Sequence, residues 1–436
     1  MIDLGRHVEA VAKARSFRIE GRVRQAVGQL VEVSGVEASV GSELEVIGRD
    51  VRLEVLGFRG DVLVTAPLGT TAGIAPGARV RLATHAAGIP VGRELLGRVL
   101  DAFGRPLDGR PAPIVMDRRA VHAAPPPAFE REPIHQLFDS GVRAIDALLP
   151  LGKGQRVGLF AGAGVGKSTL LGIMCRNAKV DVVVVGLIGE RGREVGDFVR
   201  GALGPEGLAR SVVIAATSDL PPLVRARGAL VATAVAEHFR AQGLDVLLVM
   251  DSVTRFAMAL REATLAAGEP ALTKGYTPSV FAALPALLER AGTGRKGEGS
   301  ITALYTVLAE GDDLGDPIAD AAKGILDGHI VLARSLADRG LFPAIDVLRS
   351  ISRVAPDVAP APQLGTVSKL RDLMSANEEA ADLIRIGAYV PGTDRRIDEA
   401  RVIVPMIENL IRQRHDENVP RSAALASLGT IAERLR

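Results

Sequence analysis

Residues 161–169 have the types and the order of a loop that binds phosphate groups. They read Ala-Gly-Ala-Gly-Val-Gly-Lys-Ser-Thr and lie between the apolar runs 156–160 and 170–174. In a strand–loop–helix setting, backbone N–H groups and the helix N-terminus can surround a phosphate. Lys167 would reach the β- and γ-phosphates of a nucleotide, and the Ser168 hydroxyl would bind Mg²⁺. The residues expected to contact the nucleotide are Gly162, Ala163, Gly164, Val165, Gly166, Lys167, Ser168 and Thr169.

One position departs from the usual pattern of such a loop. Ala161 stands where the first glycine is expected, but it precedes the tight part of the loop, and Gly162, Gly164 and Gly166 remain. The alternative is a glycine-rich turn with a chance Gly-Lys-Ser, which the flanking strand and helix disfavour.

An acidic residue, Asp251, ends the apolar run 247–250. An Asp at the carboxyl end of a sheet strand can hold the Mg²⁺ shell beside a phosphate loop. The alternative is an Asp that caps the next helix. Given the phosphate loop, we interpret Asp251 and Ser168 as the metal-site residues.

A second strand pattern, 187–188, leads into Gly189-Glu190-Arg191. Hydrolysis needs a group that orients and activates the attacking water, and a carboxylate at a strand end is well placed for this. Glu190 is the candidate base, and Arg191 could bind the γ-phosphate. Taken alone, the tripeptide would more simply be a solvated turn.

Length and composition limit the class of protein. The chain has 436 residues, 47% of them hydrophobic, and a formal net charge of +2. No charge-free apolar stretch has the length of a bilayer span, and five charged side chains among the first 17 residues argue against a signal peptide. The single Cys175 cannot form an internal disulfide, so we expect core packing and a cytoplasmic location. Trp is absent and Tyr occurs three times, which disfavours a nucleic-acid binder.

The elements that must position these residues follow from hydrophobic periodicity. Short period-two segments with glycine turns between about 17 and 85 predict a small β-barrel. A Pro- and Gly-rich linker follows, and apolar runs then alternate with helical patterns, as in a parallel sheet covered on both faces. The six runs predicted to be strands are 156–160, 181–188, 212–216, 245–250, 301–307 and 328–332. Strand patterns stop after about 365. We therefore expect an α/β chain with a P-loop NTPase core, divided into 1–16 (N-terminal helix), 17–90 (β-barrel), 91–135 (linker), 136–364 (P-loop domain) and 365–436 (helical domain).

Several further motifs give the chain a close resemblance to a known superfamily. Segments 189–194, 251–257 and 275–281 resemble the rotary-ATPase superfamily in order and spacing, and 141–146, 307–313 and 325–332 are similar to its branch of flagellar and type III secretion export ATPases. The resemblance runs from about Phe17 to the end of the chain. It implies a homohexameric ring that hydrolyses ATP with Mg²⁺ at subunit interfaces.

The resemblance also assigns roles to individual residues. Each site would take the loop, Glu190, Arg191 and Asp251 from one chain and Arg353 from its neighbour. Arginine suits this role because its planar donor fork stabilises charge on the transferring phosphoryl group. Phe342 matches the aromatic residue that stacks on adenine. The alternatives are a surface ion pair for Arg353 and core packing for Phe342.

Partners are implied by the same resemblance. Residues 1–16 would form a helix that docks a stator-like regulatory protein near the membrane export gate. An acidic loop containing Glu310, Asp312, Asp313 and Asp316 would face the ring's centre, and Glu378–Glu379 would lie near a central coiled-coil stalk. Solvated charge runs are the alternative for both acidic groups. Export substrates and chaperones are the expected clients, with no nucleic acid, at the inner face of the cytoplasmic membrane.

Three interpretations of the function, the first two of the same class, remain open at this point. We favour an ATP-hydrolysing export motor subunit over the catalytic subunit of a proton-translocating rotary ATPase or a nucleic-acid translocase. A non-hydrolysing docking scaffold is the third interpretation, but the presence of both Lys167 and Glu190 argues against it. Segment 316–322 favours a flagellar system slightly, whereas 166–171 also suits a virulence-type system.

Overall fold

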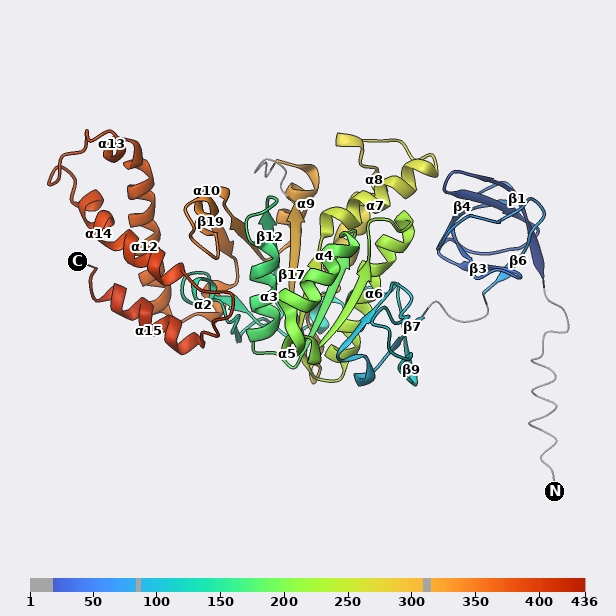
Figure 1. Ribbon diagram of the computed structural model, residues 1–436, viewed down its shortest axis with the longest axis horizontal. Coiled ribbons are helices and arrows are strands. Elements are labelled where there is room, and N and C mark those ends of the chain that lie inside the picture. The colour runs from blue at the N-terminus through green and yellow to red at the C-terminus, as the bar shows by residue number, and fades with distance from the viewer. Residues whose placement is uncertain (1–18, 84–87, 309–314, 436) are drawn as a thin grey trace, which may run out of the picture. The chain divides into compact units, whose positions relative to one another are not determined.

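The computed structural model describes residues 19–83, 88–308 and 315–435. The expected N-terminal helix 1–16 and the acids Glu310, Asp312 and Asp313 lie outside these ranges. The chain divides into two compact units, which are described separately (Figure 1). The smaller unit contains the residues up to Gly88 with the short pieces 221–224 and 262–270, and the larger unit contains the remainder.

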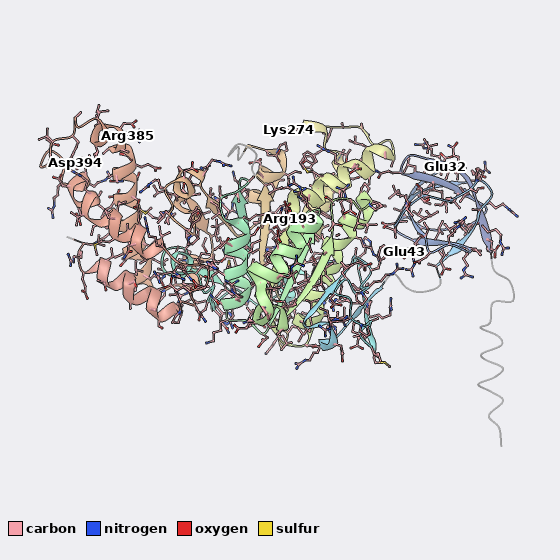
Figure 2. The ribbon with its side chains drawn as sticks, in the orientation of Figure 1. Glu32, Glu43, Arg193, Lys274, Arg385 and Asp394 are labelled. Atoms are coloured by element: carbon pink, nitrogen blue, oxygen red, sulfur yellow. The ribbon has the colours of Figure 1, made fainter. Side chains whose placement is uncertain are left out.

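The smaller unit is built on a closed antiparallel barrel. Its strands follow the order β1-β2-β5-β4-β3-β6. Alternate residues such as Val31, Val33, Leu53 and Val55 are buried inside it, because successive side chains of a strand point to opposite faces. The predicted barrel is therefore confirmed, with strands β1 (Glu20–Val27), β2 (Leu30–Ser34), β3 (Glu43–Val46), β4 (Arg52–Arg59), β5 (Val62–Pro67) and β6 (Arg79–Leu82). Glu43, labelled in Figure 2, is a buried acid of the barrel that pairs with Arg52 at 2.9 Å.

The larger unit contains a mainly parallel sheet with the order β19-β18-β12-β17-β15-β13-β14-β8, to which β16 adds beside β17. The six strands predicted from apolar runs are all present: β12 (Arg156–Ala161), β13 (Val182–Ile188), β14 (Ser211–Ala216), β15 (Asp245–Asp251), β17 (Ser300–Leu308) and β18 (Gly328–Leu332). Three further strands of this sheet were not predicted: β8 (Arg98–Leu100), β16 (Gly292–Thr293) and the antiparallel edge strand β19 (Ile345–Ser352).

Helices cover this sheet (Figure 1). The apolar face of α3, including Leu171, Met174 and Cys175, belongs to one core with Leu159 and Leu247 of the strands. Cys175 is fully buried, as the sequence predicted. The α-helices of this region, α3 included, are α2 (Arg143–Leu148), α3 (Lys167–Asn177), α4 (Gly192–Asp197), α5 (Gly204–Ala209), α6 (Pro222–Ala241), α7 (Val253–Ala266), α8 (Pro278–Leu288), α9 (Pro317–Ile325), α10 (Arg334–Asp338) and α11 (Ala355–Val358). A π-helical turn, η3 (Phe198–Leu203), lies between α4 and α5.

The C-terminal part is helical, as predicted. It consists of α12 (Ala361–Glu379), α13 (Ala381–Arg385), α14 (Arg395–Ile411) and α15 (Arg421–Ala432). Buried amides join it to the segment around α2: Gln363 Nε2 donates to the Asp146 carbonyl at 3.0 Å, and Gln413 Nε2 to the Gly141 carbonyl at 2.9 Å. Asp394, at one end of this region in Figure 2, caps α14. No helix in the described part of the chain has both the length and the apolar character that a membrane span requires.

Candidate active site

The phosphate loop connects the end of β12 to the start of α3. Gly164 and Gly166 have φ angles of 79° and 90°, a region that glycine adopts without strain. No side chain caps α3, so its first N–H groups remain available to an anion. A guanidinium also holds the loop, because Arg334 Nη2 of α10 donates to the Ala163 carbonyl at 2.9 Å. The backbone is therefore arranged as a cradle for phosphate.

Three charged residues that the sequence singled out meet beside this loop. Lys167 Nζ lies 2.5 Å from Asp251 Oδ1 and 3.8 Å from Glu190 Oε1. Asp251 is the last residue of β15 and only 3% exposed. Glu190 follows β13, the neighbouring strand. The three side chains lie together because the strands are parallel, and the carboxyl ends of parallel strands lie at the same edge of the sheet.

Glu190 occupies a buried and charge-rich position. It is 8% exposed, and Arg255 Nε of α7 donates to its Oε1 at 3.2 Å. Burial, a hydrogen bond with Glu194 and the nearby Asp251 carboxylate raise the pKa of Glu190 to about 7, although Lys167 and Arg255 oppose the shift. A carboxyl group whose pKa is close to the working pH is suited to general base catalysis. Arg255 belongs to a motif noted in the sequence, but its contact with Glu190 was not predicted.

The structure does not bring the two candidate arginines into this cluster. The Arg191 side chain is 78% exposed and pairs with Glu194 at 3.5 Å. Arg353 follows β19, and its Nη2 donates to the Lys323 carbonyl at 3.1 Å. Strand register places it far from the loop of its own chain: Ala161 and Leu332 are paired at one edge of the sheet, whereas Ser352 pairs with Gly328 toward the other.

A cavity of about 510 Å³ opens beside the loop. Phe342 and Pro343 line it together with Gly166 and Ile173. Another wall comes from the segment 412–417, of which Arg412, Gln413, Arg414, His415 and Glu417 line the cavity. Phe342 is 43% exposed. Its ring lies close to the loop, because a β-carbon on Gly166 would be in van der Waals contact with it at 3.4 Å. Size and partly apolar lining suit a small planar ligand. Sequence reasoning missed residues 412–417, because only the fold brings the turn after α14 next to the loop.

The residues available for a metal ion are few. Within the described ranges, no three His, Cys, Asp or Glu side chains are grouped to hold an ion. Ser168 and Asp251 therefore fit a cation that takes its remaining ligands from water and phosphate, as Mg²⁺ does. They do not fit one that requires an all-protein cage.

Comparison with known proteins gives matches to two family models, to close relatives and to a solved structure. The nucleotide-binding domain of the ATP synthase alpha/beta family matches residues 141–352, and the T3SS EscN ATPase C-terminal domain matches residues 359–430. The flagellum-specific ATP synthase of Salmonella typhimurium is 51% identical over 411 residues, which cover 91% of this chain and 90% of the relative. The type 3 secretion system ATPase of Xanthomonas euvesicatoria is 46% identical, covering 95% and 93%. The assembled ATPase EscN of enteropathogenic E. coli superposes with a TM-score of 0.89 at 42% identity, covering 94% of this chain and 99% of that one.

The fold and the loop define the class as nucleotide-binding P-loop ATPases of the ATP synthase alpha/beta type. Within this class, the chain belongs to the family of flagellum-specific ATP synthases and type 3 secretion system ATPases. It is an ATPase of type III protein export.

Proposed function

We propose that the chain is the ATP-hydrolysing motor subunit of a type III export apparatus and that it works as a homohexameric ring. The observation that carries the proposal is the meeting of Lys167, Glu190 and Asp251 beside the glycine loop. A phosphate-binding cation, a buried carboxyl with a raised pKa and a metal-binding carboxylate are the groups that hydrolysis of a phosphoanhydride needs.

The chemistry divides among these residues. Backbone N–H groups of residues 162–169 would hold the phosphates, and Lys167 would leave Asp251 to bind them. Ser168 and Asp251 would hold Mg²⁺, which, when bound, neutralises charge on the phosphate oxygens. Glu190, kept in place by Arg255, would orient the attacking water and accept its proton. Arg191 is exposed near Glu190 and could turn toward the γ-phosphate.

The base of the nucleotide would occupy the cavity beside the loop. Phe342 is about half exposed there, and its carbonyl accepts the Gln413 N–H at 3.0 Å. We therefore propose that Phe342 stacks on adenine and that residues 412–417 close the other side.

Assembly and partners are proposed from the relatives. EscN is described as an assembled ATPase and in complex with its central stalk EscO, so we propose a ring with a stalk partner here. Arg353 would complete the site of the next subunit. The N-terminal docking of a stator-like protein, contact with the export gate at the inner face of the cytoplasmic membrane, and delivery of substrates and chaperones belong to the same proposal.

The flagellar system is favoured slightly within this proposal. Flagellar relatives from Salmonella typhimurium and Pseudomonas aeruginosa are 51% and 48% identical, against 46% for the Xanthomonas euvesicatoria secretion ATPase. Other flagellar relatives are 43% to 46% identical, so identity supports the flagellar system only through the first two.

Among the acids proposed to face the ring's centre, Asp316 has a local role, since it caps α9 by accepting the Ile318 N–H at 2.9 Å. Because the Asp316 carboxylate serves as a helix cap, we propose the stalk contact only for the other acids.

Substitution of Glu190 tests the proposal. Glu190→Gln should retain ATP binding and lose turnover, because a neutral amide cannot accept the proton. Lys167→Ala should weaken nucleotide binding itself. Single-turnover ATP hydrolysis and equilibrium binding on the purified chains distinguish the two effects. Wild-type turnover in Glu190→Gln would contradict the assignment.

A further inference from the structure

Strand β17 carries a buried hydroxyl at the edge of the nucleotide site. It runs between β12, which leads into the phosphate loop, and β15, which ends at Asp251; Figure 1 shows it beside β12. Thr306 pairs with Leu159 on one side, and Tyr305 pairs with Met250 on the other. This register sets Thr306 beside Asp251, and the Thr306 Oγ1 lies 2.7 Å from Asp251 Oδ1.

Packing alone does not account for a threonine at this position. Thr306 is 0% exposed, and the residues immediately before this position on the same face, Leu304 of β17 and Val249 of β15, are apolar core residues. Valine has the same shape, whereas a buried hydroxyl costs free energy unless it is hydrogen-bonded. The hydroxyl can donate only one bond. The Asp251 carboxylate is closer than the Met250 carbonyl, which lies at 3.2 Å, and its charge makes it the stronger acceptor.

Nucleotide binding makes this contact more important. Asp251 Oδ1 is also the atom that Lys167 contacts at 2.5 Å. A lysine in a phosphate loop serves the β- and γ-phosphates, so Lys167 has to leave Asp251 when the nucleotide arrives. The bond from Thr306 then remains to fix the orientation of the carboxylate.

We propose that Thr306 is a positioning residue that holds the Asp251 carboxylate oriented for Mg²⁺-nucleotide binding. This proposal rests on the proposed function, because it needs Asp251 to face the cation. It extends the site by one residue from a strand that contains none of the residues assigned above. Groups that orient a metal ligand typically contribute 10- to 100-fold to metal affinity or activity.

The end of β17 does not depend on this side chain. The Leu308 N–H donates to Thr254 Oγ1 at 2.9 Å, and backbone ladders to β12 and β15 flank the strand. Thr306→Val should therefore fold, which leaves the hydroxyl as the only group removed. Thr306→Ser restores that hydroxyl. Thr302→Val is a matched control, because Thr302 is a buried residue on the same face of β17 whose Oγ1 accepts the Gly154 N–H at 2.9 Å, away from the site.

The experiment measures the affinity of each full-length variant for a fluorescent ATP analogue, with Mg²⁺ and with EDTA. In Thr306→Val, the gain in affinity that Mg²⁺ gives should fall by about tenfold or more, while affinity in EDTA stays near that of the wild type. Thr306→Ser should restore most of the gain, and Thr302→Val should keep it. Thr306→Ala provides a second hydroxyl-free variant should the valine variant not fold.

Two outcomes separate this proposal from the function on which it rests. A wild-type response to Mg²⁺ in Thr306→Val, or an equal loss in Thr306→Ser, overturns the positioning role while Lys167→Ala still loses nucleotide binding. If Lys167→Ala binds the analogue normally, or if wild-type affinity ignores Mg²⁺, the proposed site itself is wrong and the role of Thr306 falls with it.

Discussion

At the scale of single residues, the charge of Lys167 is balanced within the candidate site. Lys167 contacts Asp251 at 2.5 Å and lies 3.8 Å from Glu190, so the lysine charge is balanced by carboxylates. Taking a charged group out of water is costly unless it is paired, and this pairing offsets that cost for Lys167. Binding of a polyphosphate would replace these carboxyl groups with phosphate oxygens as the partners of Lys167. It would leave Glu190 with Arg255 as its basic neighbour and free its carboxylate to face water.

The raised pKa of Glu190 gives a prediction about pH. Burial raises this pKa to about 7, and a base has to be ionised to accept a proton. The value of kcat/KM should therefore fall as pH drops through about 7, by roughly tenfold per pH unit below it. Protonated Glu190 donates a hydrogen bond to the Glu194 carboxylate, and this bond contributes to the shift. Glu194→Gln, whose amide donates to the ionised carboxylate, should move the acid limb to lower pH.

Steady-state ATP hydrolysis between pH 5.5 and 9, over a pH range in which circular dichroism shows the fold intact, provides the measurement. An acid limb that stays in place in Glu194→Gln, or a rate independent of pH near 7, would show that Glu190 is not the titrating group.

At the scale of elements, the sequence predicted the strands that are buried on both faces and missed those at the edges of the sheet. Strands β13 and β15 lie inside the sheet and read as unbroken apolar runs, which is the pattern of a parallel sheet covered on both faces. The edge strand β19 alternates buried residues with exposed ones such as Arg349 and Ile351. Three-residue β8 offers too short a pattern to separate from the linker around it. Their pairing is set by tertiary contacts.

The same reasoning explains which site residues the sequence could indicate. Lys167, Glu190 and Asp251 stand at strand ends or in a glycine loop, where local pattern and parallel topology together predict that they meet. Thr306 lies inside an apolar strand, and residues 412–417 follow a helix in a distant part of the chain. Neither has a local pattern of its own. Only the register of β17 and the packing of the C-terminal helices bring them to the site.

A buried ion pair ties elements together on another part of the larger unit. Arg290, 1% exposed, donates to Glu237 of α6 through Nε and Nη2, both at 2.9 Å. Arg119 of β9 (Asp117–Ala120) also pairs with Glu237, at 3.2 Å. Burial alone would raise the pKa of Glu237, but the hydrogen bonds from Arg290 prevail and lower it. This carboxylate therefore stabilises the fold above its unfolded pKa of about 4.3, and the contribution is lost as pH falls through the lower folded pKa.

Removal of one partner of the Arg290–Glu237 ion pair should destabilise the fold. Arg290→Met should lower the free energy of unfolding by about 3–5 kcal/mol at pH 7, because it leaves Glu237 buried with too few donors. The double variant Glu237→Leu/Arg290→Met should recover much of this loss. Arg396→Met, which removes an exposed pair with Asp372, serves as a control with a cost below about 1 kcal/mol. Urea unfolding followed by circular dichroism measures all three, and equal costs for Arg290→Met and Arg396→Met would contradict the argument.

At the scale of the whole molecule, the proposed active site draws one of its groups from a second chain. The cluster around Lys167 contains the carboxyl groups of Glu190 and Asp251, but the candidate Arg353 lies at the opposite end of its own sheet. An arginine that stabilises the transferring phosphoryl group contributes roughly 10³-fold or more to the rate. If Arg353 serves a neighbouring chain, the specific activity has to rise with protein concentration, because dilution removes the donor from each site.

Mixing two inactive variants tests this sharing directly. Arg353→Ala keeps its own loop and lacks the donated arginine, whereas Lys167→Ala keeps the arginine and lacks a working loop. In a mixed ring, the interfaces where an Arg353→Ala loop meets a Lys167→Ala neighbour carry both intact halves, so ATP hydrolysis should return to a fraction of the wild-type rate. Mixing Arg353→Ala with the double variant Lys167→Ala/Arg353→Ala should restore nothing, since no chain then supplies the arginine. The rate per subunit, measured across mixing ratios and total concentrations, should peak at comparable amounts of the two single variants. A rate that responds neither to mixing nor to concentration would place the whole active site within one chain and assign Arg353 to a surface contact.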